Sequence, residues 1–225
     1  MIVTIDGPAG AGKSTTARTL AQRLGFRFLD TGAMYRAVAY AGLRRKIDWH
    51  DPAKLVELAR RLKLDVSEDR VLIDGEDGTT AIRTQEVTAV TRYAANNPGV
   101  RELMVEQQRA MACGDDLVTE GRDQGTIVFP HAECKIFLTA TPVERARRRA
   151  LELSKRGEHV SVEKVLADQE QRDFSDSSRA VGPLAAADDA IEFITDGLTR
   201  DEVVDGLERL VRQRMSELTP SKHGD

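Results

Sequence analysis

The chain has 225 residues, 40% hydrophobic and 31% charged, enough to bury one large core with a small appended subdomain. Its net charge of −4 argues against a general affinity for nucleic acid or for an anionic membrane. No run is long enough to span a membrane, no signal-peptide pattern opens the chain, and Cys113 and Cys134 make no metal-binding spacing, so we expect a cytoplasmic protein with free thiols.

A strand, a glycine-rich turn and a helix are predicted at the start of the chain. Residues 2–5 form a short apolar run typical of a buried strand, and apolar side chains recur at helical spacing from Ala17 to Leu24. Residues 7–14 between them read G-P-A-G-A-G-K-S, which fits the phosphate-binding pattern G-x-x-x-x-G-K-[ST]. Strand, turn and helix are the context that this motif requires.

This motif predicts a site for nucleotide phosphates. Glycines let successive N–H groups converge on phosphate oxygens, and the helix N-terminus adds partial positive charge there. We expect Lys13 to reach the β- and γ-phosphates and the Ser14 hydroxyl to bind Mg²⁺. A glycine-rich turn without a ligand is the other interpretation, which the surrounding strand and helix disfavour. The predicted phosphate-binding residues are Gly7, Pro8, Ala9, Gly10, Ala11, Gly12, Lys13, Ser14 and Thr15.

The middle of the chain interrupts its helices with a short antiparallel segment. The predicted elements are, in order, a strand at residues 26–29, helices at 33–43 and 52–62, short strands within 64–82, and helices at 86–93 and 100–111. The turns Asp74-Gly75 and Asp77-Gly78 separate the short strands. We therefore predict a β insertion in an otherwise alternating βα pattern.

The second half returns to alternating strands and helices. The predicted elements are strands at residues 117–119, 136–138 and 190–195, and helices at 142–155, from 161 onward, and at 201–218. The helix that begins at Ser161 is expected to bury Val162, Val165, Leu166 and Gln169. The polar residues 219–225 are expected to be a disordered tail. This order predicts an α/β protein with a doubly wound parallel sheet, helices on both faces, and a ligand at the carboxyl ends of its strands.

A phosphate loop does not by itself distinguish kinases from switch GTPases or transport ATPases. The GTPase patterns N-K-x-D and D-x-x-G are absent, as is the transporter signature L-S-G-G-Q. Arg172, Asp176 and Arg179 fall at i, i+4 and i+7, which predicts one stripe of a helix. Two cations around one carboxylate could hold a phosphate, although a solvated helix face with an ordinary ion pair fits the same spacing.

Several ordered motifs resemble those of the bacterial cytidylate kinases, in the nucleoside monophosphate kinase group of phosphate-loop proteins. The resemblance runs through nearly the whole chain. Its motifs are I-D-G-P-A-G-A-G-K-S-T at residues 5–15, D-T-G-A-M-Y-R at 30–36, I-R-T-Q-E-V at 82–87, V-R at 100–101, G-R-D-Q-G-T at 121–126, R-D-F-S-D-S-S-R at 172–179 and P-L-A-A-A-D-D-A at 183–190.

The resemblance implies an enzyme that phosphorylates CMP and dCMP with ATP and Mg²⁺. We expect it to be a monomer that binds neither nucleic acid nor membranes. The resemblance divides the chain into a core (residues 1–30, 99–153 and 182–218), a monophosphate-binding subdomain (31–98, with the β insertion at about 62–85) and a helical lid (154–181). It carries over a CMP site of Thr31, Tyr35, Arg36, Arg101, Arg122, Asp123, Arg172, Asp176 and Arg179. The groups that it implies in catalysis are Lys13, Arg122, Arg172 and Arg179.

Further arginines lie where the resemblance places the start of the lid. Arg145 and Arg149 are candidate helpers that would reach the transferring phosphoryl group as the lid closes, whereas Arg147 and Arg148 fit an exposed basic helix face equally well. The four histidines lie outside every motif and are interpreted as surface residues: His50, His131, His159 and His223.

Two positions depart from the family pattern. Glu120 stands where relatives often carry Asp before G-R-D, and Arg92 stands where they often place a Ser near the pyrimidine. Whether Glu120 binds the metal ion is therefore left open. A contact from Arg92 to the base is left open too, and Thr91 could make that contact instead.

Two other functions stay open on sequence grounds. One is a phosphate-loop kinase for another acceptor, such as a different monophosphate or shikimate. The other is a regulatory or nucleic-acid-binding NTPase, whose usual marks of basic net charge or switch motifs are missing.

Overall fold

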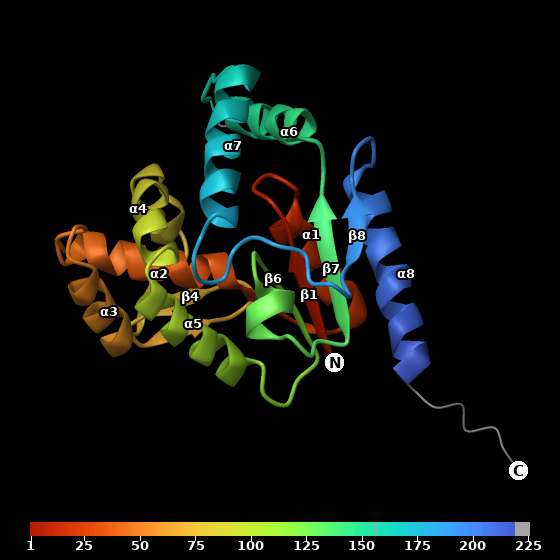
Figure 1. Ribbon diagram of the computed structural model, residues 1–225, viewed down its shortest axis with the longest axis horizontal. Helices are drawn as coiled ribbons and strands as arrows, with labels where there is room; N and C mark the ends of the chain where they lie inside the picture. Colours follow the sequence, from red (N-terminus) through yellow and green to blue (C-terminus); the bar gives the residue numbers. More distant parts are fainter. Residues whose placement is uncertain (156, 219–225) are drawn as a thin grey trace, which may run out of the picture.

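Five parallel strands form the central sheet of the computed structural model, which describes residues 1–155 and 157–218 (Figure 1). Their spatial order is β2-β6-β1-β7-β8, with every neighbouring pair parallel. The bounds are β1 Ile2–Asp6, β2 Arg27–Asp30, β6 Leu117–Gly121, β7 Cys134–Thr139 and β8 Ile191–Ile194. The chain winds outward from β1 in both directions, which confirms the predicted doubly wound parallel sheet. The predicted disordered tail at residues 219–225 lies outside the described residues.

Helices α1 (Lys13–Leu24) and α8 (Arg200–Leu218) cover one face of the sheet. They pack on alternate strand residues such as Val3, Ile5 and Ile136, all of them buried. Gly25 ends α1 in the left-handed conformation, at φ 71°, which glycine adopts without steric cost. The helix and its stop therefore lie where the apolar spacing and Gly25 predict them.

The opposite face of the sheet carries a second apolar cluster, to which residues 31–98 contribute many side chains. Leu117 packs here whereas its neighbour Val118 packs against α1, because successive strand side chains point to opposite faces. Helix α5 (Pro98–Met111) and the π-helical turn η2 (Gln124–Val128) lie against this face. The remaining helical elements between β2 and α5 are α2 Thr31–Arg44, α3 Pro52–Arg61, the 3-10 turn η1 Ala81–Arg83 and α4 Gln85–Ala95.

The predicted β insertion is a three-stranded antiparallel sheet. It comprises β3 Leu64–Val66, β4 Val71–Ile73 and β5 Glu76–Asp77, in that spatial order. The turn between β4 and β5 is the expected Asp74-Gly75 pair, in which Gly75 has a left-handed φ of 88°. The turn between β3 and β4 is instead made by residues 67–70, and the Asp77-Gly78 pair ends β5 rather than separating two strands. Arg18 of α1 donates a hydrogen bond to the Glu68 carbonyl at the turn between β3 and β4, so the insertion touches the helix that follows the phosphate loop.

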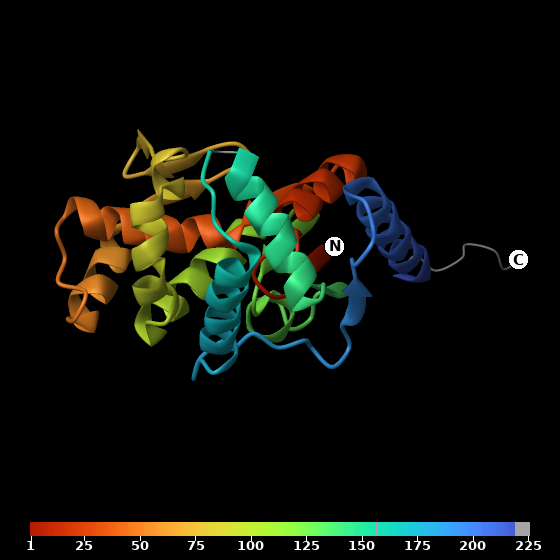
Figure 2. The ribbon, with the colours of Figure 1, turned by 90° about the horizontal axis from the view of Figure 1, so that it is seen from above.

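Helices α6 (Pro142–Lys155) and α7 (Val162–Ser177) stand over the carboxyl ends of the strands, and the β7 arrow points towards α6 (Figure 1). Seen from above, α7 lies between the sheet and the subdomain (Figure 2). Of the stripe predicted for α7, Val165 and Gln169 are buried, and Val162 and Leu166 are half-buried. The placement of α7 brings its side chains to the edge of the sheet where a ligand was predicted.

None of the helices in residues 1–155 and 157–218 combines the length and apolarity needed to cross a membrane.

Candidate active site

The phosphate loop joins β1 to α1 and is shaped by three glycines. Gly7, Gly10 and Gly12 have φ values of 148°, 78° and 89°, which other residues rarely adopt. A side chain at Gly7 would also collide with the Leu138 carbonyl of the neighbouring strand. No side chain among the described residues caps the N-terminus of α1, so the N–H groups of its first turn are left without a side-chain acceptor there. This geometry suits a phosphate at the helix N-terminus.

Asp6 anchors this loop to the turn after β6. Its two carboxylate oxygens accept the backbone N–H groups of Gln124, at 2.9 Å, and Gly125, at 2.7 Å. Burial raises the pKa of Asp6 to about 6 in spite of these two hydrogen bonds. The loop and the G-R-D segment are thereby held in one fixed arrangement.

Lys13 folds back over the loop, where its Nζ donates to the Pro8 carbonyl at 2.7 Å. The side chain is buried, and burial together with the cations of Arg122 and Arg172 lowers the pKa of Lys13 to about 7. Lys13 is thus poised to gain from an incoming polyanion.

Ser14 and Glu120 form an oxygen pair beside the loop. The Ser14 hydroxyl donates to Glu120 Oε1 at 2.7 Å. Burial, and secondly the negative charge of Asp30, raise the pKa of Glu120, so this carboxylate lacks full charge compensation. A hydroxyl and a carboxylate are the oxygen ligands that Mg²⁺ takes together with phosphates and water, so these two residues fit the predicted ion.

A buried ion pair lies between α5 and the turn after β6. Arg101 of α5 pairs with Asp123, and both side chains are almost inaccessible to solvent. The guanidinium also donates to the Ala95 carbonyl at 3.0 Å and lies 5.5 Å from the centre of the Tyr35 ring. Arg101 Nε is buried without a hydrogen-bond partner among the described residues, leaving one donor free.

Thr31 and Arg36 line the same region from α2. The Thr31 hydroxyl donates to the Glu120 carbonyl at 2.7 Å, which ties the start of α2 to the end of β6. Arg36 is half-buried and donates to the Thr88 hydroxyl of α4 at 2.8 Å. Burial lowers the pKa of Arg36, and Arg83 and Arg149 contribute to this shift because all three are cationic.

Asp176 of α7 binds two arginines. Its Oδ2 accepts Arg122 Nε at 2.8 Å, and its Oδ1 pairs with Arg179. Burial opposes ionisation of Asp176, but these two cations outweigh it and lower its pKa. Arg172, one turn earlier on α7, makes no hydrogen bond or ion pair with the described part of the chain. Two of the predicted arginines, Arg122 and Arg179, therefore meet at Asp176, whereas Arg172 stays without such a partner among the described residues.

A family model described as cytidylate kinase matches residues 3–213 of this chain. The chain is 55% identical over 213 residues to a cytidylate kinase from Rhodopirellula baltica, covering 95% of this chain and 93% of that protein. It is 48% identical to a cytidylate kinase from Desulforamulus reducens, covering 91% and 94% of the two chains. The chain belongs to the cytidylate kinase family. The predicted family and the predicted kinase class are confirmed.

Two further matches are a longer, bifunctional relative and a solved structure with a similar fold. A bifunctional pantoate ligase/cytidylate kinase from Synechococcus elongatus is 51% identical, and the match spans 95% of this chain but only 42% of that protein. An uncharacterized protein from Eubacterium ventriosum superposes with a TM-score of 0.51 at 12% identity, covering 95% of this chain and 98% of the other. The second match concerns the fold alone.

Three sequence predictions about arginines in this cytidylate kinase family member need correction. Helix α7 ends at Ser177, so Arg179 does not share a helical stripe with Arg172; the turn after the helix folds it back onto Asp176. Arg145 is not a free helper, because it is buried and bound to protein carbonyls and a carboxylate. Arg148 is not simply exposed, since it donates to Thr195 Oγ1 at 2.9 Å and to the Thr195 carbonyl at 2.7 Å.

The two departures from the family pattern have different outcomes. Glu120 reaches the Ser14 hydroxyl, so its longer side chain is compatible with a place beside the metal. Arg92 is exposed and lies 5.1 Å from the ring centre of its neighbour Tyr93, while the Thr91 hydroxyl donates to the Val87 carbonyl at 2.7 Å. Both side chains are engaged within α4.

Sequence reasoning missed two carboxylates of the site. Asp6 lies directly before the glycine-rich motif, a position that could have indicated an anchor for the loop. Asp173 lies beside Arg172 and contacts the phosphate loop, and no spacing in the sequence signals this contact. His50, His131 and His159 are exposed as predicted, and His223 lies outside the described residues.

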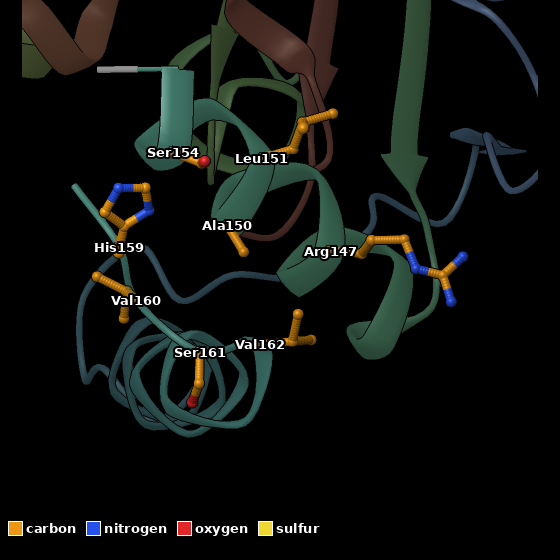
Figure 3. A pocket seen from close by; sticks show the side chains of 8 residues that line it. All are labelled: Arg147, Ala150, Leu151, Ser154, His159, Val160, Ser161 and Val162. Atoms are coloured by element: carbon orange, nitrogen blue, oxygen red, sulfur yellow. The ribbon is translucent and has the colours of Figure 1, made fainter. Parts of the chain in front are cut away.

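Two surface cavities flank these residues. One, of about 440 Å³, lies between α1 and the β insertion, and Ser14, Arg18 and Arg83 are among the residues that line it. The other, of about 490 Å³, lies between α6 and the segment that enters α7 (Figure 3). His159 and Val160 form one side of this second cavity, and none of the predicted site residues lines it.

Proposed function

We propose that the chain transfers the γ-phosphoryl group of ATP to CMP and dCMP, forming CDP and dCDP. The observation that carries the proposal is the meeting of two kinds of site just after β6. Glu120, near the end of β6, accepts a hydrogen bond from Ser14 beside the phosphate loop, and Asp123, after β6, pairs with Arg101 of α5. A donor site and an arginine-rich acceptor site therefore share one short segment, and family membership supports a cytidine monophosphate as the acceptor.

The donor site is assigned to the phosphate loop and the first turn of α1, residues 7–15. Backbone N–H groups would bind the phosphate oxygens, and Lys13 would add a positive charge. Ser14 and Glu120 would hold Mg²⁺, which when bound neutralises part of the charge on the phosphates.

The acceptor site is assigned to the arginines and carboxylates that surround Asp176 and Asp123. Its proposed members are Thr31, Tyr35, Arg36, Arg101, Arg122, Asp123, Arg172, Asp176 and Arg179. Arg101 with its free Nε–H supports contact to the base or sugar, and the unpaired Arg172 supports contact to phosphate.

This transfer needs charge neutralisation more than a general base. The nucleophile is a phosphate oxygen of the monophosphate, which is already anionic near neutral pH, so no hydroxyl proton has to be removed. The difficulty is the repulsion between two polyanions, and positioned cations reduce it. Lys13, Arg122, Arg172 and Arg179 are assigned this role, in keeping with a site that presents no histidine or cysteine.

Residues 154–181 are proposed to act as a lid, in keeping with the three-part division predicted from the sequence. A closed lid would exclude water, which otherwise competes as phosphoryl acceptor. Monomeric state, cytoplasmic location and the use of Mg²⁺ belong to the same proposal.

The decisive experiment measures ADP release from Mg·ATP with CMP, dCMP, UMP, AMP or shikimate offered separately. We expect fast turnover with CMP and dCMP, and loss of turnover by a factor of at least about 100 in Lys13→Ala, because one charge-assisted contact in the transition state is worth roughly 3 kcal/mol.

Turnover with shikimate or AMP instead would replace the proposed acceptor. Hydrolysis of ATP that depends on nucleic acid would favour a regulatory NTPase.

A further inference from the structure

Helix α7 directs three polar side chains towards the phosphate loop and Arg122: Gln169, Asp173 and Asp176. Gln169 and Asp176 are buried, and the side chain of Asp173 is only 17% exposed. Asp176 faces Arg122 on the acceptor side, whereas Asp173, one turn earlier, faces the phosphate loop. The two carboxylates thus engage opposite sides of the site from one helix.

Asp173 engages the loop once directly and once through Arg145 of α6. Its Oδ1 accepts the Ala9 N–H at 3.0 Å, and its Oδ2 pairs with Arg145 at 2.6 Å. Arg145 in turn donates to the Ala9 carbonyl at 2.7 Å and to the Ala140 carbonyl at 3.1 Å. Both backbone groups of Ala9 are therefore held by side chains from outside the loop, and Asp173 belongs to α7.

Gln169 reinforces this contact. A side chain added at Gly10 would bring its Cβ within 2.5 Å of Gln169 Nε2, so α7 lies directly on the loop at that point. The same amide nitrogen lies 3.5 Å from the Arg145 carbonyl.

These contacts link loop shape to the position of α7. Gly10 and Gly12, which have positive φ values here, lack a side chain that would restrict the backbone. The loop therefore has many accessible conformations unless its peptides are held by contacts from outside. Phosphate binding needs successive N–H groups to converge, which requires one of these conformations. Arg145 is buried, and without Asp173 its charge would lose its only carboxylate partner among the described residues.

We propose that Asp173 is a positioning residue that couples the closure of α7 to the shape of the phosphate loop and so governs use of the donor nucleotide. This inference rests on the proposed phosphoryl transfer. It predicts that two carboxylates one helical turn apart control different substrates: Asp173 the donor and Asp176 the acceptor.

The test compares Asp173→Ala, Asp173→Asn and Asp176→Asn with a matched control, Asp168→Asn. Asp168 lies on the same helix, is exposed, and pairs with Lys164 at 2.7 Å. We expect Asp173→Ala to raise the KM for ATP roughly ten- to a hundredfold, the range for loss of a charged hydrogen bond, with the KM for CMP changed less than about threefold. Asp176→Asn should give the reverse pattern, and the control should match the wild type.

Asp173→Asn guards against misfolding, since it keeps an oxygen to accept the Ala9 N–H and loses only the charge opposite Arg145. It should raise the KM for ATP less than Asp173→Ala does. An equal rise in both Michaelis constants for the Asp173 variants would indicate general destabilisation and overturn the proposal.

A second readout does not depend on catalysis. Hydrogen exchange at the Ala9 amide, measured by NMR on the ligand-free protein, should be about tenfold or more faster in Asp173→Ala than in the control. Mg·ATP binding measured by calorimetry should weaken in parallel. If the wild type fails to phosphorylate CMP, the proposed function is wrong but these two measurements still decide the role of Asp173; unchanged exchange and binding would refute it.

Discussion

Burial and two neighbouring arginines lower the pKa of Lys13 to about 7, so the ligand-free enzyme carries this lysine only partly charged at neutral pH. The phosphates of a bound nucleotide would supply the missing counter-charge and raise the pKa again. The same reasoning applies to Glu120, whose raised pKa would fall beside a cation. Burial of these two ionisable side chains thus destabilises the ligand-free protein, and a bound ligand would offset that cost.

Binding of Mg·ATP should therefore be accompanied by proton uptake. With a pKa of about 7, Lys13 is mostly neutral at pH 8, so binding should take up most of one proton; at pH 6 it is already mostly charged, and the uptake should be much smaller. Calorimetry in buffers of different ionisation enthalpy measures this number. The Lys13→Met variant, if it retains measurable binding, should show no such uptake, and an uptake that grows as the pH falls would contradict the assignment.

At the scale of elements, the segment after α7 seals the acceptor side. Gly182 has a left-handed φ of 61° and packs directly on Arg101 and Asp123, with no room for a side chain. The Leu184 N–H donates to the Asp176 carbonyl at 2.8 Å, which ties the same segment to the end of α7. The chain that leaves α7 thus holds the buried ion pair in place.

Gly182→Ala should destabilise the protein by about 1–3 kcal/mol, which for a chain of this length lowers Tm by very roughly 2–12 °C. The added methyl group must displace Arg101 or Asp123, so the KM for CMP should rise more than the KM for ATP.

Gly197→Ala is the matched control for Gly182→Ala, because Gly197 has a φ of 73° but nothing within 4 Å of the added carbon. Gly197→Ala introduces the same kind of backbone strain but no steric collision. Equal effects of the two substitutions would show that strain alone is responsible and that the ion pair is not disturbed.

Across the whole molecule, the segment proposed as a lid contacts the segment proposed as the monophosphate-binding subdomain at two points. Gln85 at the start of α4 donates to Glu158, in the segment before α7, at 2.6 Å. Arg179 beyond α7 donates to Asn96 at 3.0 Å. These contacts join parts of the chain that belong to different proposed units, so they should favour the closed arrangement over an open one.

Replacing Gln85 by Ala should raise the KM for ATP and for CMP by a similar factor of about 2–5, since an exposed hydrogen bond to a charged group contributes roughly 0.5–1 kcal/mol to the closed population. Thermal unfolding should change little. Gln213→Ala is the matched control, because Gln213 makes the same kind of bond to Glu217, at 3.0 Å, within α8. Steady-state kinetics that do not distinguish the two variants would contradict a role for Gln85 in closure.

The order of elements could be predicted because it depends on short-range patterns. Apolar spacing, Asp-Gly turns, Pro142 and Gly25 lie within the elements that they start or end, so one window of sequence is enough. The boundary of α7 was wrong for the same reason. The spacing of Arg172 and Arg179 fits a helix, yet the ion pair of Arg179 with Asp176, three residues before it, is made from the turn that follows the helix.

The sequence by itself determined the phosphate-loop motif and the family, because each motif is a contiguous run of residue types with one chemical use, and it supplied the residues proposed for the acceptor site. Tertiary structure alone decided which charges meet. Ala9 and Asp173 lie 164 positions apart, and Arg145 is withdrawn from catalysis only because the fold buries it beside both. Partner choice for a long charged side chain depends on which segments the sheet and lid bring within about 3 Å of it, and no local spacing records that.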